Sequence, residues 1–336
     1  MRAPVPQPLI SVIVVNWNGR ALLEECLHSL EKQTFKDFEI ILVDNGSSDD
    51  SAEWVRSHYP LVKLLALKTN TGFSAGNNAG LGLARGEFIA LLNNDTKVEP
   101  GWLEALYQCI RADERIAACD SMVLYYDQPG LIWSAGGIYT IAGSVSPRRY
   151  QQPDNGPGQG PQDVFIAVAC AALYRKKVIQ EIGFFDETYF NGYEDVDWSF
   201  RAHLFGYRIV NVPAARVYHK VSSTQIHNSP GFVYNGQRNV SATFIKNMPG
   251  RLFFKYLPLH LAYVLGSFWY FLKVGQSGAF IRAKCSLIRQ ISLLISQRNA
   301  LQARKTISPD AIDGLLEKKW LDAKINKYRK NNHAKG

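Results

Sequence analysis

The stretch NGYEDVDWSFRAHLFGY, residues 191–207, gathers the carboxylates Glu194, Asp195 and Asp197 where a helical pattern begins. Acidic side chains are stabilised near a helix N-terminus, so the cluster could simply cap the helix. A positioned carboxylate can also accept a proton as a general base. The cluster therefore predicts either a capped helix or an acid–base site, and other polar residues that meet it would favour the second.

Polar side chains also follow three predicted strands, each at the point where the strand ends. In an open parallel sheet these carboxyl ends meet at one edge, which is where ligands bind. Taken singly, each set is explained by a turn or a helix cap, but together they predict a binding site. The three sets are Asn16 and Asn18, then Asp44 and Ser47, then Asn93, Asn94 and Asp95.

The usual phosphate-binding loops are missing from the sequence. No G-x-G-x-x-G follows the first strand and no G-x-x-x-x-G-K-[ST] occurs anywhere. For the glycine-rich run at 72–80, close helix packing is a commoner explanation than a ligand. A divalent cation is another way to hold a diphosphate, and it takes hard oxygen ligands such as Asp95. His219 is a candidate second ligand, with a structural histidine as its alternative.

Strand and helix patterns alternate four times within the first 95 residues. Short apolar, β-branched runs alternate with segments of helical spacing, as in LISVIVVNWNG followed by RALLEECLHSLEKQ. Such alternation predicts βαβ units and a parallel sheet covered on both faces. Beyond it, strands are expected at AACDSMVLYY, LIWSAGGIYT, VFIAVACAALYR, YRIVNVP and ARVYH, a loop at 151–163, and a helix from the acidic cluster to about Phe205.

The basic charge belongs to the C-terminal part of the chain. Residues 251–336 hold 16 Lys and Arg against 4 Asp and Glu, whereas residues 1–250 hold 22 against 25. We therefore expect no nucleic-acid binding by the main fold. The apolar run at 256–272 is shorter than the roughly 20 residues that a spanning helix needs. The spacing of Ile281, Ile288, Ile291, Leu294 and Ile295 predicts a basic amphipathic helix at a membrane interface.

Composition agrees with a folded protein in a reducing compartment. Hydrophobic residues make up 46% of the chain, which is ample for a core. The five cysteines are scattered and odd in number, and MRAPVPQPLI has no apolar run long enough for a signal peptide. We expect a cytoplasmic protein that lies on the inner face of the cell membrane.

Six segments in this order resemble family 2 inverting glycosyltransferases, and in particular their bacterial rhamnosyltransferase-like branch. They are SVIVVNWNG, EIILVDNGSSDDS, TGFSAGNNAG, ALLNNDTKVEPGWL, GFFDETYFNGYEDVDWSFRAHLFGY and VYH, and they span about two thirds of the chain. The resemblance implies the GT-A nucleotide-sugar fold, an α/β fold with a mostly parallel central sheet. We place this domain at residues 8–235 and a basic, helical, membrane-associating tail at 250–336.

The same resemblance assigns roles to the polar residues. Asp195 would be the catalytic base and Glu194 beside it would bind the acceptor. Asp95 and His219 would hold Mn²⁺ or Mg²⁺ on the diphosphate. The family has a D-x-D motif where this chain has Asn93-Asn94-Asp95, so Asn93 leaves one charge fewer on the metal or contacts the sugar or ribose instead. The nucleotide-sugar would be bound by Asn16, Asn18, Asp44, Ser47, Gly76, Asn77, Asn93 and Asn94.

The resulting hypothesis is a metal-dependent inverting hexosyltransferase. The donor is a nucleoside-diphosphate sugar, with dTDP-rhamnose as first candidate, and the acceptor is a glycan or lipid-linked glycan of cell-surface polysaccharide. Two alternatives come from other classes. One is a catalytically silent nucleotide-sugar-binding membrane adaptor, against which Asp95, Asp195 and His219 argue. The other is a nucleotidyltransferase, which would carry a glycine-rich basic loop that NWNGRALLEE lacks.

Overall fold

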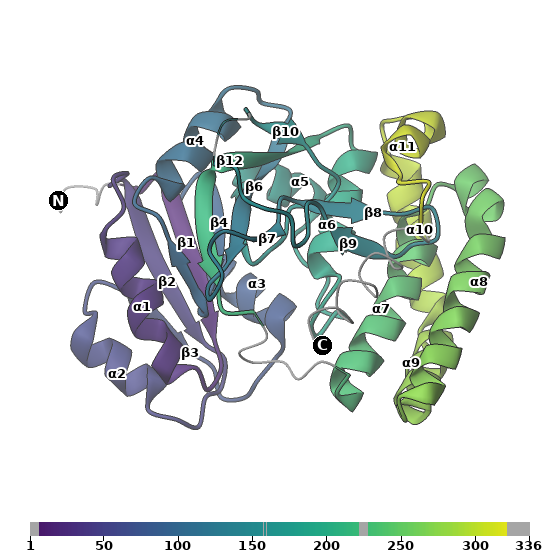
Figure 1. Cartoon of the computed structure of the whole chain (residues 1–336), viewed down its shortest axis with the longest axis horizontal. Coiled ribbons are helices and arrows are strands. Elements are labelled where there is room, and N and C mark those ends of the chain that lie inside the picture. The colour runs from purple at the N-terminus through teal and green to yellow at the C-terminus, as the bar shows by residue number, and fades with distance from the viewer. Residues whose placement is uncertain (1–6, 157, 159, 222–227, 321–336) are drawn as a thin grey trace.

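The protein is seen here as a computed structural model, which describes residues 7–156, 158, 160–221 and 228–320. Its first half has the predicted alternation of strands and helices (Figure 1). The elements run β1 (Ile10–Asn16), α1 (Arg20–Glu31), β2 (Phe38–Asp44), α2 (Ser51–His58), β3 (Lys63–Ala66), α3 (Phe73–Leu83), β4 (Phe88–Asn93), β5 (Thr96–Val98) and α4 (Trp102–Arg111). The four predicted strands and the three predicted helices between them are confirmed; β5 and α4 were not predicted.

The second half supplies the rest of the sheet and the helix that begins at the acidic cluster. Its elements are β6 (Ile116–Tyr125), β7 (Ile132–Ser134), β8 (Gly137–Tyr139), β9 (Val145–Pro147), β10 (Gln162–Asp163), β11 (Ala171–Arg175), α5 (Lys176–Ile182), α6 (Glu194–Leu204) and β12 (Arg208–His219). The two strands predicted at YRIVNVP and ARVYH form the single strand β12, whose register shifts between Val212 and Arg216. The strand predicted over VFIAVACAALYR is confined to β11.

The main sheet is mixed, with strand order β10-β12-β6-β11-β4-β1-β2-β3. Strands β4, β1, β2 and β3 are parallel neighbours, which brings their carboxyl ends to one edge. In register, Asn16 faces Asp44, and Val15 faces Asn93. Strand β11 enters antiparallel between β4 and β6. The short β5 pairs with the end of β12 and sets Thr96 opposite His219.

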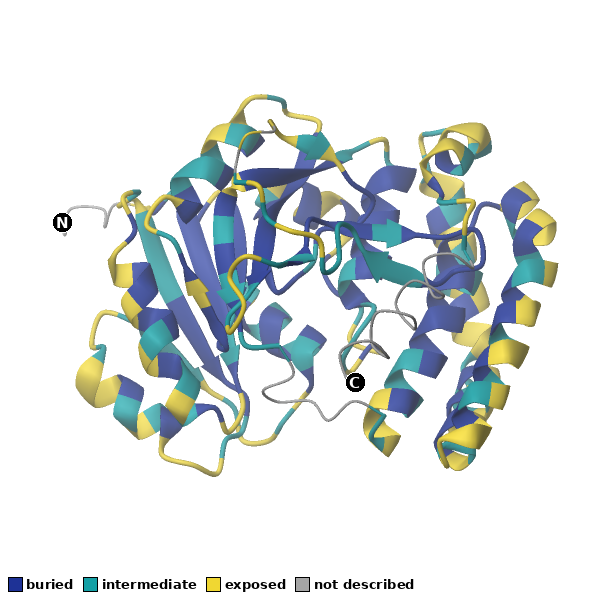
Figure 2. Ribbon diagram, in the orientation of Figure 1, coloured by how far each residue is buried: buried dark blue, intermediate teal, exposed yellow. Residues whose placement is uncertain are grey.

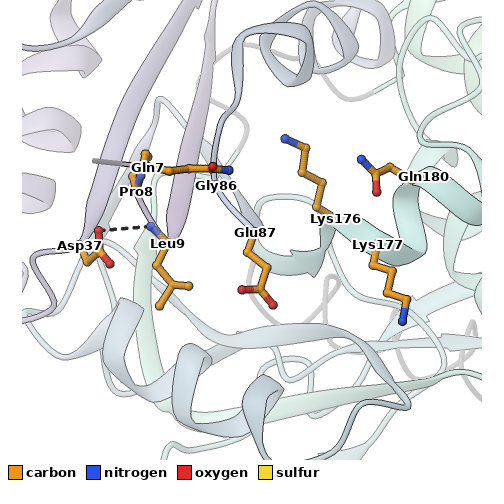
Figure 3. Close-up of a pocket in the computed structure, with 9 residues that line it drawn as sticks. All are labelled: Gln7, Pro8, Leu9, Asp37, Gly86, Glu87, Lys176, Lys177 and Gln180. Atoms are coloured by element: carbon orange, nitrogen blue, oxygen red, sulfur yellow. Dashed lines mark hydrogen bonds between the residues drawn. The ribbon is translucent and has the colours of Figure 1, made fainter. Parts of the chain in front are cut away.

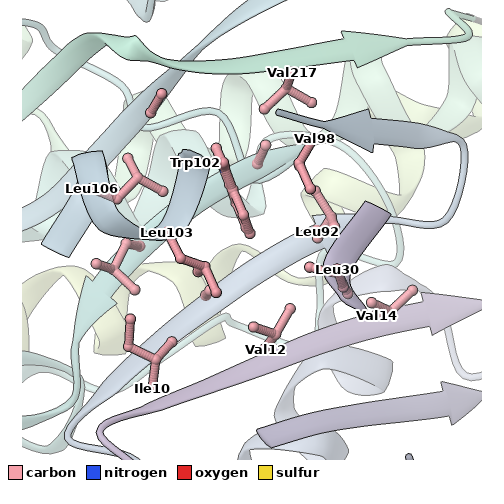
Figure 4. Packing of buried hydrophobic residues seen from close by; sticks show 14 of the residues in the cluster. Ile10, Val12, Val14, Leu30, Leu92, Val98, Trp102, Leu103, Leu106 and Val217 are labelled. Atoms are coloured by element: carbon pink, nitrogen blue, oxygen red, sulfur yellow. The ribbon is translucent and has the colours of Figure 1, made fainter. Parts of the chain in front are cut away.

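Helices cover both faces of the sheet, and successive side chains of β1 point alternately into the two cores that these helices form. Ile10, Val12 and Val14 pack with Leu30 of α1 and with Trp102, Leu103 and Leu106 of α4 (Figure 4). Ile13 belongs to the opposite core, with α5 and α6. A side-chain period of two on a strand buried on both faces explains why this segment is almost entirely apolar.

The C-terminal helices lie side by side at one end of the molecule, away from α1 and α2 (Figure 1). They are α7 (Pro230–Asn247), α8 (Gly250–Lys273), α9 (Ser277–Arg289), α10 (Ile291–Arg304) and α11 (Pro309–Leu315). The predicted boundary at residue 235 falls inside α7. The single amphipathic helix expected from Ile281 onward is broken at Gln290, and Leu294 is 2% exposed, so it does not share the exposure of Ile288 and Ile295.

The C-terminal helices pack against the half of the molecule that contains the main sheet through one shared cluster. Val196 and Phe200 of α6 share a buried core with Phe244, Leu252 and Tyr256. The inner side of α8 is therefore buried, while its outer side carries exposed residues (Figure 2). Within the described part of the chain, every helix is too short or too polar to cross a membrane. The basic end after residue 320 lies outside the described residues.

Candidate active site

The polar strand ends meet as predicted, at the carboxyl edge of β1, β2 and β4. Asn16 is fully buried; its amide nitrogen lies 3.3 Å from the Asp44 carboxylate, to which it donates. Its amide oxygen accepts from Asn94, at 2.7 Å. The hydroxyl of Ser47 accepts from the backbone N–H of Asn18, at 2.9 Å. The structure thus brings these five residues into one hydrogen-bonded group.

Gly76 and Asn77, which were predicted to bind the nucleotide, take part in the packing of α3. A Cβ on Gly76 would sit 3.0 Å from Val15 and 3.3 Å from Asn45, so this glycine lets α3 approach β1 and β2. Asn77 is 1% exposed, and its side chain donates to the backbone oxygen of Phe73 at 2.8 Å. Their nucleotide contacts stay predictions, and the packing role that the glycine-rich run also predicted is present.

Asp95 and His219 come together although they are far apart in sequence. The backbone N–H of Lys220 donates to the backbone oxygen of Asp95 at 2.9 Å, and His219 Nε2 lies 3.2 Å from Asp95 Oδ1. Burial lowers the pKa of His219, but the neighbouring Cys170 sulfur and the Asp95 carboxylate outweigh it and raise the value to about 10. Both side chains are almost completely buried.

The pair has donor atoms suited to a divalent cation. His219 Nδ1 is buried without a hydrogen-bond partner, and Asp95 Oδ1 has only the ion-pair contact to the imidazole. A carboxylate oxygen and an imidazole nitrogen both bind Mn²⁺. In the described parts of the chain, no three His, Cys, Asp or Glu side chains are placed to hold a metal ion. The residues present would therefore supply two of the ligands of a divalent cation.

The acidic cluster divides into two kinds of carboxylate. Asp195 is half-buried at the start of α6; it accepts from the backbone N–H groups of Ala169, at 3.2 Å, and Val196, at 2.8 Å. Burial raises its pKa against these hydrogen bonds. Burial and the charge of Asp195 raise the pKa of Glu194 well above its usual value, and Glu194 Oε2 has no hydrogen-bond partner.

Asp197, by contrast, is structural. Its two oxygens accept from Arg201, at 2.9 Å, and from Asn247, at 2.8 Å, and Lys246 lies 2.9 Å away. The Asp197 side chain is completely buried, so the hydroxyl of a substrate cannot reach it. Asp197 ties α6 to α7.

Two features of the site were not identified from the sequence. The first is the segment before β11: Val168 donates to Asp120 at 2.8 Å, Ala169 donates to Asp195, and Cys170 lies against His219. The second is Asp120 itself, whose pKa burial raises to about 8. The sequence feature that could have indicated Asp120 is a charged residue inside the apolar run AACDSMVLYY.

A separate cavity of the described structure lies away from this site. A cleft of about 500 Å³ lies between Leu9, Asp37, Gly86 and Lys176 (Figure 3). These residues precede β1, β2 and β4, or follow the antiparallel β11. The cleft is therefore at the amino edge of the parallel strands, opposite the polar group formed by Asn16, Asp44 and Asp95.

Solved structures with the same fold are glycosyltransferases. S. aureus TarS in complex with UDP-GlcNAc matches with a TM-score of 0.57 at 18% identity, over 90% of this chain and 88% of that chain. The mannosyltransferase PcManGT from Pyrobaculum calidifontis, in complex with GDP-Man and Mn²⁺, matches with a TM-score of 0.54 at 17% identity, over 89% and 82%. The fold is thus the GT-A fold of nucleotide-sugar-dependent glycosyltransferases.

Sequence comparison supplies the family. The model for glycosyl transferase family 2 matches residues 11–183, and the chain belongs to that family. N-acetylglucosaminyl-diphospho-decaprenol L-rhamnosyltransferase of Mycobacterium tuberculosis is 29% identical over 242 residues, which are 64% of this chain and 78% of that protein. Cholesterol galactosyltransferase of Borreliella burgdorferi is 36% identical over 120 residues, 35% and 33% respectively. The chain is therefore a glycosyltransferase similar to a rhamnosyltransferase.

Proposed function

We propose that this glycosyltransferase moves a sugar, with rhamnose as first candidate, from a nucleoside diphosphate to a lipid-linked glycan of cell-surface polysaccharide, with inversion. One arrangement supports it most. Ala169 contacts the carboxylate of Asp195, and the next residue, Cys170, lies against His219. A base for the acceptor hydroxyl and the residues for the diphosphate are thus held by adjacent residues of one segment.

Each residue then has a role in the transfer. Asp44, Asn16 and Ser47 bind the nucleoside at the ends of β1 and β2. Asp95 and His219 would hold Mn²⁺ or Mg²⁺, which stabilises the negative charge that develops on the leaving diphosphate. Asp195 accepts the proton of the acceptor hydroxyl as its oxygen bonds to the anomeric carbon. Because the hydroxyl attacks from the face opposite the leaving diphosphate, the configuration inverts.

A donor screen tests this assignment. The wild-type protein would be incubated with dTDP-rhamnose, UDP-GlcNAc and GDP-mannose, and its unfolding followed by thermal shift. A donor at about 100 times its Kd stabilises the folded state by about 2.7 kcal/mol. We expect dTDP-rhamnose to stabilise most, and the stabilising donor to support transfer to a lipid-linked GlcNAc acceptor. Stabilisation by none of the three, with no transfer, would contradict the proposal.

We also propose that the outer side of α8 lies on the inner, anionic surface of the cell membrane. Five large apolar side chains are exposed there: Phe254, Leu261, Leu265, Trp269 and Leu272. Lys255 and Lys273 flank this face. Apolar residues that enter the headgroup region, together with nearby basic residues, give peripheral binding.

Point variants test the membrane contact better than truncation does. Removing the chain after residue 248 would expose Val196 and Phe200, which pack with Leu252 and Tyr256. The double variant Leu261→Ser/Leu265→Ser changes only exposed residues. In flotation with vesicles rich in phosphatidylglycerol, the wild type should float and the variant should stay in the soluble fraction. Equal recovery of both in either fraction would contradict the membrane proposal.

A further inference from the structure

A second cavity lies beside the loop that leads into the acidic cluster. Its volume is about 410 Å³, within the range of about 300–1,000 Å³ that is usual for small-molecule sites. Three elements line it: the loop before α6, one side of α7, and the junction of α9 and α10. Lining residues include Thr188, Phe190, Tyr234, Arg238, Gln290 and Leu293.

Arg238 gives this cavity a positive charge that no carboxylate of the described residues neutralises. The guanidinium donates to two neutral amides, Asn239 Oδ1 at 2.7 Å and Gln290 Oε1. No Asp or Glu of the described chain lies within ion-pair distance of it, although the residue is only 4% exposed. Two turns further along α7, Lys246 is paired with Asp186 at 2.7 Å and with Asp197 at 2.9 Å.

The sequence explains why a counter-ion is missing. Residues 198–309 contain 15 Lys and Arg and not one Asp or Glu. Neither α7 nor the two helices packed on it can therefore supply a carboxylate. Burying an unpaired charge is costly unless something compensates it. A guanidinium that faces an open cavity can gain its partner from a bound anion, for which its planar fork is suited.

The cavity is joined to the proposed acceptor side of the active site. Asn239, next to Arg238, donates to the backbone oxygens of Asn191, at 3.3 Å, and Gly192, at 2.7 Å. These residues directly precede Tyr193, Glu194 and Asp195. An anion beside Arg238 would thus lie next to the loop that carries the proposed base.

The opening of the cavity is apolar. Phe190 and Leu293, which line it, are 46% and 47% exposed. Ile288, Ile291 and Ile295 on the adjoining turns of α9 and α10 are exposed too. A ligand that fits this combination has an anionic group attached to an apolar chain.

We propose that this cavity binds the diphosphate of a lipid-linked acceptor, with Arg238 as its cation and the exposed side chains of Phe190 and Leu293 against the first part of the lipid. The inference rests on the proposed function, which gives a lipid-linked acceptor to the same active site. It adds the place and the chemistry of acceptor recognition. The sugar attached to the diphosphate would extend from Arg238 along residues 190–192 toward Asp195.

Direct binding tests the subsite without any sugar transfer. Farnesyl diphosphate carries the diphosphate and an apolar chain, and inorganic pyrophosphate carries the anion alone. By calorimetry, the wild type should bind farnesyl diphosphate more tightly than pyrophosphate. Because hydrogen bonds to charged groups are worth about 1.5–3 kcal/mol, Arg238→Met should weaken farnesyl diphosphate binding at least about tenfold. Arg282→Gln, which removes an exposed cation of α9 outside the cavity, should leave the affinity unchanged.

A second variant covers the case in which Arg238→Met fails to fold. Leu293→Glu changes a half-exposed residue and sets a negative charge at the opening, so it should weaken farnesyl diphosphate binding, whereas Leu293→Gln should do so much less. Affinity of the wild type for farnesyl diphosphate that equals its affinity for pyrophosphate would overturn the lipid part of the proposal. Unchanged binding in Leu293→Glu, or no binding to the wild type, would overturn the subsite. Binding without any donor-dependent transfer would leave the subsite standing and refute the proposed function.

Discussion

Nε2 of His219, the last residue of β12, lies 3.2 Å from Oδ1 of Asp95, the residue between β4 and β5. The contact follows from the pairing of β5 with β12, which sets Thr96 opposite His219. The two buried side chains are thus positioned by backbone hydrogen bonds between strands. A cation bound by this pair would need further ligands from the substrate, because the described chain places no third ligand beside them.

The metal role predicts unequal effects for the two ligands. Asp95→Ala removes the only carboxylate of the pair and should lower kcat/KM about 100-fold or more, because a cation contributes several kcal/mol at a developing charge. His219→Ala removes an imidazole that would bind the cation after losing its proton, and it should mainly raise the Mn²⁺ concentration needed for half-maximal rate. Mn²⁺ binding would be followed by electron paramagnetic resonance with dTDP present. Full activity of the wild type in excess EDTA would show that the cation is not needed.

Asp195→Asn should reduce transfer by about 10² to 10⁴, because it removes the proton acceptor but keeps the shape. Donor affinity should be nearly unchanged. In the wild type, burial raises the pKa of Asp195, so kcat/KM should fall as the pH drops through a value above that of an exposed aspartate, about 3.9. A pH–rate profile measures this. Glu194→Gln should chiefly raise the acceptor KM, and near-normal turnover of Asp195→Asn would assign the base to Glu194 first.

Gly19→Ala should weaken donor binding without touching a charged group. A Cβ there would lie 2.3 Å from Asn94 Nδ2 and 2.5 Å from Asn16 Oδ1, the two atoms of a 2.7 Å hydrogen bond. Separating them displaces the group that holds Asp44, so we expect the donor KM to rise about tenfold and stability to fall by about 1–3 kcal/mol. Gly82→Ala is the matched control, because open space surrounds that position. The same donor KM in both variants would contradict the role of the Asn16–Asn94 pair.

The strands and helices around the site could be predicted because local patterns determine them. Val12, Val14 and the neighbouring residues are apolar at both strand faces, and Asn16 marks where the buried strand ends. The close approach of α3 at Gly76 was also foreseeable as packing. Strand β12 was split in prediction because Pro213 and two alanines interrupt its pattern; the register shift after Val212 absorbs these residues, and pairing with β6 continues.

The contacts in the site that could not be predicted from the sequence depend on packing between residues that are far apart in the chain. The sequence offered His219 only as a candidate ligand beside Asp95, and the family resemblance assigned the pair, since no spacing rule joins them. Arg238 could not be predicted as a binding residue from the sequence, because α7 carries many polar residues and its pattern is typical of a solvent-exposed helix. Arg238 is buried because α9 and α10 pack onto α7. Only this packing shows that its guanidinium lacks a carboxylate partner among the described residues. The stripe from Ile281 to Ile295 misled for the same reason: the break at Gln290 turns Leu294 inward.

His260 predicts how pH affects the attachment of the tail. The imidazole is buried between α8 and the catalytic half, where it contacts the Ala142 oxygen at 2.8 Å and the Ser241 hydroxyl at 3.1 Å and stacks on Phe244. Burial lowers its pKa to about 4. The folded state therefore favours the neutral ring, and this contribution is complete above the unfolded pKa of about 6.5. It is lost as the pH falls from there toward 4.

The loss should reach about 2 kcal/mol at pH 5 and about 3 kcal/mol at pH 4, since each pH unit between the two pKa values corresponds to about 1.4 kcal/mol for one proton. Urea unfolding of the wild type and of His260→Asn at pH 7.5, 6 and 5 would measure it. The variant should be less stable at pH 7.5, because it loses the ring packing, but its stability should fall less on acidification. Subtracting the pH dependence of the variant's unfolding free energy from that of the wild type cancels the contribution of the other titrating groups, among them the buried His203. His28→Asn, an exposed change on α1, should keep the wild-type slope; if His260→Asn keeps it as well, His260 is not the group that couples tail packing to pH.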